Sequence, residues 1–166
     1  MIDHRISKPA GLSGYEVHRM VAGLVKGAGV LFVDNGDHVL VRSDLPLTDI
    51  GHPLAVPQTN AVLCFELKAS VAQRIGRKNV YPELHDWPSR RTWLDAQGKK
   101  LGFEVLAAHV QGGRETVADG KGRQFWIDAS RFTGVLKVSD SEAFAVALAK
   151  GIGRVGKAFG MGMLVI

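Results

Sequence analysis

The chain has 166 residues, of which 46% are hydrophobic, so it can bury one good core or two small ones. No stretch approaches the run of about 20 apolar residues that spans a membrane, and no apolar signal-peptide block opens the chain. We therefore expect a cytoplasmic protein without a membrane segment. The single cysteine, Cys64, excludes an internal disulfide and a cluster of thiolate metal ligands.

Positive charge is concentrated in part of the chain. The formal net charge is +5, and residues 68–100 alone carry eight Lys or Arg against three Asp or Glu. This distribution favours a polyanionic partner, although a solvated basic face would have the same composition.

The first half predicts the element order β-α-β-β-(α)-β. Residues 2–8 suit a short strand, and Ser13-Gly-Tyr-Glu16 fits a capping box that starts a helix. Residues 29–33 and 38–42 flank the tight-turn signal Asn35-Gly-Asp37 and predict a hairpin. A short helical turn near residues 47–51 and a long strand over residues 59–69 complete this half.

The second half predicts β-α-β-β-α-β, with its first strand uncertain. Residues 70–81 form a basic loop or strand edge, residues 88–101 suit a helix and residues 103–110 a strand. A polar, glycine-rich tip follows over residues 111–122, then a strand-like stretch over residues 125–138. Ser139-Asp-Ser-Glu142 repeats the capping-box spacing and opens a helix that ends at Lys150.

Together the two halves predict an α+β fold made of two tandem ferredoxin-like (RRM-like) βαββαβ domains with antiparallel sheets. We place the first domain at residues 1–70 and the second at residues 71–166. RNA-binding proteins share this topology.

Five glycines occupy residues 151–162, just before the last apolar strand. They match the patterns G-x-G-x-x-G and G-x-x-x-x-G-K, both of which need a strand before the glycines and a helix after them. Here a helical pattern precedes them and Ala158 replaces the metal-binding Ser or Thr, so we expect no nucleotide cofactor. A glycine-rich loop packed against an extended anion stays open, as does tight packing of the last strand against the helix.

The spacing of the histidines does not indicate a metal site. None of the six pairs with another at metal-ligand spacing, and no H-E-x-x-H motif occurs, so we expect no metal and no cofactor. One constellation stands apart: Tyr15, His18 and Arg19 lie within five residues at the start of the first helix. A phenol, an imidazole and a guanidinium can perform acid–base chemistry beside an anion, although Tyr and His are common on helix surfaces.

Several segments resemble one family. Gly14-Tyr-Glu-Val-His-Arg-Met-Val21 is similar to the "YxxHRxL" helix of CasE-type (Cse-class) CRISPR endoribonucleases. Residues 132–138, the helix after them and residues 151–165 resemble the family's "FEGxLxV…GIGxxKAxGxGLLxV" ending. Residues 63–70 are similar to its "FRLRANP" strand, and Trp93-Leu94 followed by residues 102–106 follows its "AWLxxRxxxxGF" pattern.

The resemblance covers nearly the whole chain and implies an RNA-processing enzyme. It implies two ferredoxin-like domains that bind the stem-loop of a CRISPR repeat transcript and cut it without a metal. The expected reaction is attack by the 2′-hydroxyl, which leaves a 2′,3′-cyclic phosphate and a 5′-hydroxyl end. The crRNA would stay bound, within an effector complex.

The roles that follow can be assigned to residues. His18 fits the general acid or base, Tyr15 can orient the 2′-hydroxyl or share the proton transfer, and Arg19 can contact a phosphate. We expect the remaining RNA contacts at Arg74, Arg77, Lys78, Arg90, Arg91, Arg114, Lys121, Arg123, Gly153, Arg154 and Lys157.

Two alternatives remain. The first is a non-cleaving subunit that only grips crRNA within the effector complex, against which the presence of Tyr15 and His18 argues. The second is a ferredoxin-like regulatory or small-ligand domain unrelated to RNA, in which the positive charge of the second half would have no functional role.

Overall fold

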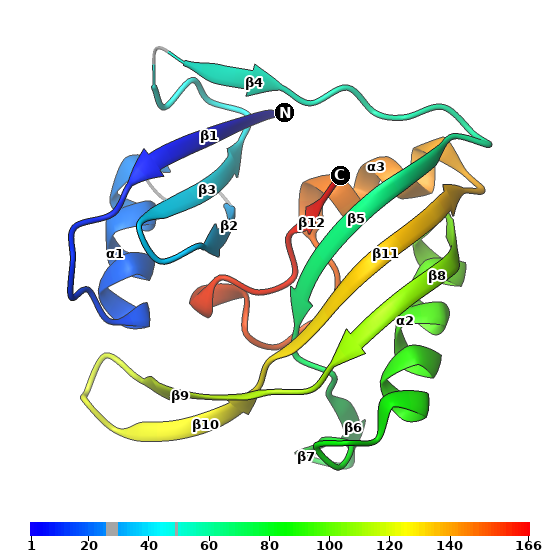
Figure 1. The fold of residues 1–166 in the computed structure, drawn as a ribbon. Helices are drawn as coiled ribbons and strands as arrows, with labels where there is room; N and C mark the ends of the chain where they lie inside the picture. The colour runs from blue at the N-terminus through cyan, green and yellow to red at the C-terminus, as the bar shows by residue number, and fades with distance from the viewer. Residues whose placement is uncertain (26–29, 49) are drawn as a thin grey trace.

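The computed structural model describes residues 1–25, 30–48 and 50–166 (Figure 1). The predicted start of a strand at Gly29 lies outside these residues. The described helices are too short or too polar to cross a membrane.

The first sheet has four antiparallel strands in the order β2-β3-β1-β4. One helix, α1, packs on it through the buried Val17 and Val21, which meet the apolar face of the sheet. No helix occurs among residues 30–48, where a short helical turn was predicted to begin. The elements are β1 (Ile2–Ser7), α1 (Gly14–Val25), β2 (Leu31–Asp34), β3 (His38–Ser43) and β4 (Gly51–Pro53).

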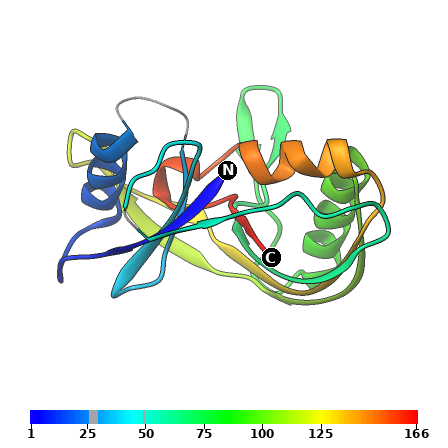
Figure 2. The same cartoon turned by 90° about the horizontal axis from the view of Figure 1, so that it is seen from above.

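The second sheet also has four antiparallel strands, in the order β12-β5-β11-β8. Two helices cover one face, and the other face is open (Figures 1 and 2). The elements are β5 (Val62–Ala69), α2 (Trp87–Leu101), β8 (Phe103–Gln111), β11 (Ser130–Val138), α3 (Ser141–Lys150) and β12 (Leu164–Val165).

Three small elements extend this frame. β6 (Gln73–Ile75) and β7 (Lys78–Val80) form one short hairpin. β9 (Arg114–Ala118) and β10 (Gln124–Asp128) form a second, which continues from β8 and β11 toward α1 (Figure 1). The 3₁₀ turn η1 (Lys157–Phe159) lies within the glycine-rich run.

In both sheets the first and third strands of the unit are central and the second and fourth are at the edges. This arrangement confirms the prediction of two tandem ferredoxin-like units. The first unit differs in having a loop in place of its second helix.

The assignment of one strand was wrong. Residues 59–69 were expected to close the first sheet, but β5 pairs with β11 and β12 and is the first strand of the second sheet. The first sheet is closed instead by β4, which has only three residues. The chain therefore passes from one sheet to the other between β4 and β5, and not at residue 70.

A buried arginine fastens the two sheets together. Arg42 on β3 is almost fully buried and pairs with Asp3 on β1, with Nε 2.7 Å from Oδ1. Its Nη1 also donates to the carbonyls of Leu164 (2.9 Å) and Leu148 (3.3 Å) in the second unit. Because these donors link two sheets directly, the first unit is held in a set position against the C-terminal strand.

Candidate active site

Helix α1 begins at the predicted capping box. The backbone N–H and the hydroxyl of Ser13 donate to Glu16 Oε2 at 2.8 and 2.7 Å. These hydrogen bonds lower the pKa of the Glu16 carboxyl, with the side chain of Ser13 as the first cause. Val17, Val21 and Val25 are buried, so Tyr15 and His18 lie beside the buried stripe at the edge of the helix.

His18 is half-buried and held against an aromatic ring. Its imidazole stacks on Phe32 of β2, with ring centroids 6.5 Å apart and an interplanar angle of 27°. Its Nδ1 is buried and has no hydrogen-bond partner among the described residues. Buried polar atoms in native proteins nearly always have partners, so His18 Nδ1 is an exception among the described residues.

Tyr15 is also half-buried, and its hydroxyl lies against the tip of the β9–β10 hairpin. A Cβ atom at Gly120 would lie 2.6 Å from Tyr15 Oη, closer than carbon and oxygen can approach without a shift. Glycine at this position therefore permits the close approach of the hairpin to α1. Tyr15 on α1 is thus in contact with the hairpin that was predicted to hold RNA.

The glycine-rich run lies on another side of α1, so the two ends of the chain meet (Figures 1 and 2). A Cβ atom at Gly14 would lie 3.9 Å from Phe159 of η1, and one at Gly160 would lie 3.0 Å from Phe32. Gly156 and Gly160, which flank η1, have φ values of 85° and 73°, in the left-handed region that favours glycine. The run forms a compact loop that packs beside the Tyr15 and His18 helix.

The backbone of this loop is tied to the second sheet. The N–H of Ile152 donates to the carbonyl of Gly162 (2.7 Å), and the N–H of Gly162 donates to the carbonyl of Lys68 (2.7 Å). Gly153 has a φ of 84° and its Cα faces the ring of Trp93. Tight packing of the glycines, one of the two readings from sequence, is therefore present.

The cations of this loop differ in accessibility. Lys157 Nζ donates to the carbonyl of Lys150 (2.5 Å), and burial lowers the pKa of its ammonium group. Arg154 is exposed and lines a hollow together with Arg74 and Lys100. Arg154 is therefore the more available cation for an anionic ligand.

The basic hairpin β9–β10 carries three of the predicted contacts. Arg114, Lys121 and Arg123 are all exposed. Arg123 is paired with Asp119, with Nη2 2.7 Å from Oδ2, and Asp119 also accepts from the backbone N–H groups of Lys121 and Arg123. These bonds shape the tip, from which Lys121 projects, whereas Arg114 lies at the base of the hairpin opposite Asp128.

The β6–β7 hairpin carries the next group. Arg74, Arg77 and Lys78 are exposed on it. Arg19 on α1 is exposed as well. All four cations are accessible, but Arg19 lies on α1, apart from the three cations of the β6–β7 hairpin.

The prediction that Arg90 contacts RNA was wrong. Only 1% of this residue is exposed, and its guanidinium donates to Asp128 Oδ1 (2.6 Å) and to the hydroxyl of Ser130. Further bonds reach the carbonyls of Pro82 and Glu83. Arg90 therefore anchors the base of the β9–β10 hairpin to α2 and has no free donor face for RNA.

Arg91, another of the predicted RNA contacts, is half-buried. Its Nε donates to Asp95 Oδ1 (2.9 Å) and its Nη2 donates to the carbonyl of Val105 (2.7 Å). The bond to Val105 ties α2 to β8, the bond to Asp95 lies within α2, and together they occupy much of the guanidinium.

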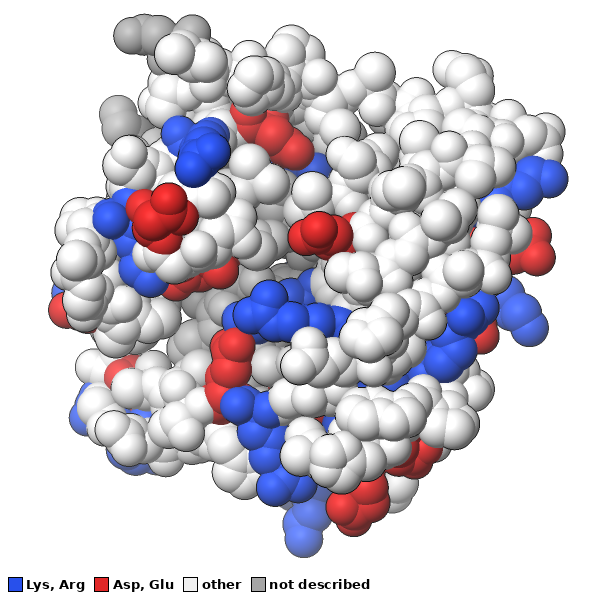
Figure 3. Space-filling model, in the orientation of Figure 1, with Lys and Arg blue, Asp and Glu red and all other residues white. Residues whose placement is uncertain are grey.

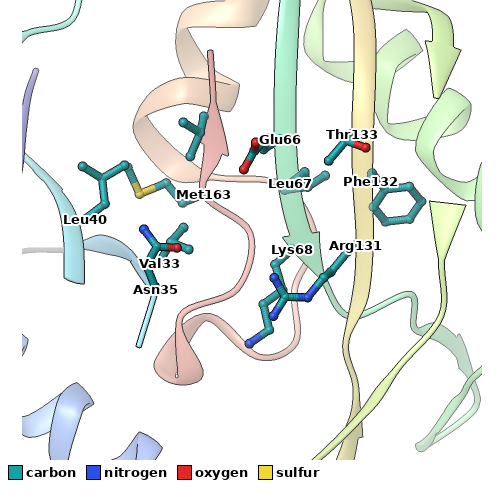
Figure 4. A pocket seen from close by; sticks show the side chains of 11 residues that line it. Val33, Asn35, Leu40, Glu66, Leu67, Lys68, Arg131, Phe132, Thr133 and Met163 are labelled. Carbon is teal, nitrogen blue, oxygen red and sulfur yellow. The ribbon is translucent and has the colours of Figure 1, made fainter. Parts of the chain in front are cut away.

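A hollow of about 110 Å³ lies between the two sheets, and its cations were not among the predicted contacts. Lys68 on β5 and Arg131 on β11 are direct cross-strand neighbours and point into it (Figure 4). Lys68 is paired with Glu115 of the basic hairpin at 2.7 Å. Figure 3 shows basic side chains gathered in the hollow between the two halves.

The sequence did not indicate that Phe32 would contact His18 or that Gly120 would lie against Tyr15. Gly120 sits in a run typical of a turn, and nothing in that run indicates contact with a tyrosine about 100 residues earlier. No group of three or more His, Cys, Asp or Glu side chains in the described part of the chain could hold a metal ion.

Comparisons with solved structures support the fold. A structure of the CRISPR endoribonuclease Cse3 bound to a 19 nt RNA is 23% identical, covers 99% of each chain and superimposes with a TM-score of 0.84. The CRISPR-associated protein Cas6e from Escherichia coli K-12 is 21% identical over 99% of this chain and 98% of its own, with a TM-score of 0.80. A chain of a CRISPR RNA-guided surveillance complex is 22% identical over 99% and 98%, with a TM-score of 0.76.

The sequence itself carries a family signature. A search of curated proteins found no match. Residues 55–166 match the family model described as CRISPR associated protein, which covers more than half of the 166 residues. The chain therefore belongs to the family of CRISPR associated proteins.

Proposed function

We propose that this protein is a metal-independent endoribonuclease that cuts CRISPR repeat stem-loop RNA at one site and then retains the crRNA. One observation carries the proposal: Tyr15 and His18 lie on one helix that contacts both the basic hairpin and the glycine-rich loop. A substrate held by those two elements would meet an acid–base pair.

The reaction needs no metal nucleophile because the RNA supplies its own. The 2′-oxygen forms a bond to the adjacent phosphorus, and the bond from phosphorus to the 5′-oxygen breaks. One proton leaves the 2′-hydroxyl and one is delivered to the 5′-oxygen. The products are a 2′,3′-cyclic phosphate and a 5′-hydroxyl end.

His18 performs one of these proton transfers, since an imidazole can accept or donate a proton near neutral pH. Such acid–base help typically accelerates a reaction by about 10²–10⁴-fold. Tyr15, one turn earlier, orients the 2′-hydroxyl or shares the transfer. Arg19 is exposed on the next position of the helix and contacts a phosphate.

RNA holding falls to exposed cations of the second half: Arg74, Arg77, Lys78, Arg114, Lys121, Arg123 and Arg154. Similarity to Cse3 bound to RNA supports this assignment, and similarity to a chain of an RNA-guided surveillance complex supports effector subunits as partners. Gly153 contacts the RNA through its backbone, on the side of the chain that does not face Trp93.

The test is incubation of the purified protein with its repeat RNA in EDTA. We expect cleavage at one position, lost in His18→Ala and with a 2′-deoxy nucleotide at the cut. His52→Ala is the matched control, because His52 is an exposed histidine on β4 in the first sheet.

Other outcomes discriminate the alternatives. Tight binding of intact RNA by the wild-type protein would favour a non-cleaving crRNA-binding subunit. No binding at low salt would overturn both and favour a regulatory or small-ligand domain.

A further inference from the structure

The outer face of the β9–β10 hairpin carries two aromatic side chains, Trp126 and Tyr81, to which the proposed function assigns no role, beside the proposed RNA contact Arg114. Trp126 on β10 is 48% exposed. Tyr81 lies against it, with ring centroids 5.3 Å apart and an angle of 54° between the rings. The guanidinium carbon of Arg114 lies over the indole, 4.6 Å from its centroid. We call these three residues the aromatic platform.

The platform faces away from the candidate active site. In the β9–β10 pairing, Trp126 lies opposite Thr116 and Arg114 opposite Asp128, so Trp126 and Arg114 share one face of the ribbon. Phe125 and Ile127 point to the other face. There Phe125 meets Phe159 of η1 edge-on, with centroids 6.0 Å apart, and Ile127 packs in one cluster with Met161.

Packing of the hairpin against the rest of the protein does not explain why a tryptophan occupies position 126. Ile127, the next residue, is 3% exposed and supplies the buried contact with the rest of the protein. Trp126 instead presents about half of its surface to solvent beside a fixed cation. A large exposed aromatic side chain next to an arginine is a surface typical of ligand recognition.

The surrounding charge favours a nucleic acid over a protein as the ligand. Residues 73–81, which end at Tyr81, include three exposed cations and no carboxylate. Asp128, the acid paired opposite Arg114, is buried and neutralised by Arg90 at 2.6 Å. Aromatic rings flanked by cations are the arrangement with which proteins hold unpaired bases, since the rings stack on bases and the cations meet phosphates.

We propose that the aromatic platform binds an unpaired nucleotide of the RNA strand that leaves the stem. Its base stacks on the exposed part of the Trp126 indole, and Arg114 meets the adjoining phosphate. This inference rests on the proposed function, because it concerns the same RNA, but it assigns a separate subsite with a separate ligand feature. Loss of the platform should reduce affinity for RNA with a single-stranded extension and spare affinity for the bare stem-loop.

The experiment compares three RNAs by fluorescence anisotropy, each with a 2′-deoxy nucleotide at the cut so that it stays intact. One is the stem-loop alone, one has an unpaired four-nucleotide extension, and one has the same extension without bases. Extensions are placed on the 5′ side and on the 3′ side in turn. The proteins are wild type, Trp126→Leu, Trp126→Phe and Trp87→Leu.

For the wild-type protein we expect an extension with bases on one side to tighten binding by about tenfold over the abasic extension. Trp126→Leu, which keeps an apolar side chain against Tyr81, should lose this gain, and Trp126→Phe should keep most of it. Trp87→Leu is the control for removal of an exposed tryptophan, since Trp87 is 40% exposed on α2 outside the platform. All four proteins should bind the bare stem-loop equally.

An undiminished gain in Trp126→Leu, or equal binding of abasic and normal extensions on both sides, would overturn the platform while leaving the proposed function intact. The same result is expected if the platform binds a protein partner. If all four proteins, the wild type included, fail to bind the bare stem-loop, the proposed function is overturned, and with it the platform.

Discussion

Substitution of Gly120 by alanine tests whether the hairpin tip positions Tyr15. Gly120 does not have a left-handed φ, so alanine adds no backbone strain there. Its Cβ would lie 2.6 Å from Tyr15 Oη and 3.1 Å from Cζ, whereas ordinary contacts begin at 3.4 Å. Because real contacts do not fall below 3.0 Å, the phenol or the tip must move, and an ordinary contact requires about 0.8 Å, the difference between 3.4 and 2.6 Å. A displacement of about 1 Å at a reacting group can slow a reaction by about 10²-fold.

The assay is single-turnover cleavage of repeat RNA at saturating protein, with the Kd measured in parallel. Gly120→Ala should slow cleavage by about 10²-fold and leave the Kd unchanged, because the contact is with Tyr15 and not with a phosphate-binding cation. In a Tyr15→Phe background the nearest atom is gone, so the added alanine should have a much smaller effect.

The matched control is Gly23→Ala on the same helix, where no atom lies within 4 Å of the new Cβ. It should leave cleavage unaltered. Full additivity of Gly120→Ala and Tyr15→Phe, or wild-type cleavage by Gly120→Ala, would refute the positioning of Tyr15 by the hairpin.

Three further predictions follow from named contacts. Arg90→Met leaves the buried Asp128 without its partner and should lower the free energy of unfolding by about 3–5 kcal/mol in a denaturant titration; a loss below about 1 kcal/mol would contradict the anchoring role. Hydrogen bonds from the side chain and backbone of Ser89 lower the pKa of the Asp86 carboxyl, so its contribution to stability is complete above the ordinary carboxyl pKa near ~4 and is lost as the pH falls through the lowered pKa. The melting temperature of Asp86→Asn should therefore fall less than that of wild type between about pH 5 and about pH 2; parallel curves would contradict this. Lys121→Ala should weaken RNA binding and reduce the slope of log K against log salt by about one, and an unchanged slope would exclude a phosphate contact at this residue.

Local signals predicted most of the secondary structure and the pairing of β2 with β3, but not the sheet that β5 joins. The Ser13–Glu16 capping box marks the start of α1 because both of its hydrogen bonds are local. The predicted box at Ser139 was one residue early, since Asp140 caps α3 by accepting from the N–H groups of Glu142 and Ala143. The sheet to which β5 belongs depends on β11 and β12, which lie far along the chain.

The burial of Arg90, which was predicted to contact RNA, could be inferred only in part from the sequence. Arg90 lies four residues before Leu94 and three before Trp93, so helical spacing puts all three on one side of α2. Its charge suggested an outward position. What the sequence could not provide was Asp128, whose carboxylate makes burial of that charge tolerable.

The placement of Tyr15 and His18 as neighbours on one helix was predictable from the sequence. Their surroundings were not, since Phe32, Gly120 and Phe159 arrive from three separate elements. The glycine-rich loop is far from His18 in the sequence, and the sequence did not indicate that folding brings it beside α1 (Figure 1).

End-group analysis of the cleavage products in EDTA tests the central claim most directly. We predict that the upstream fragment ends in a 2′,3′-cyclic phosphate and the downstream fragment begins with a 5′-hydroxyl that a kinase can label at once. Both fragments should be absent with His18→Ala. A 5′-phosphate on the downstream fragment, or cleavage that starts only when Mg²⁺ is added, would contradict attack by the 2′-hydroxyl with His18 as the proton-transfer group.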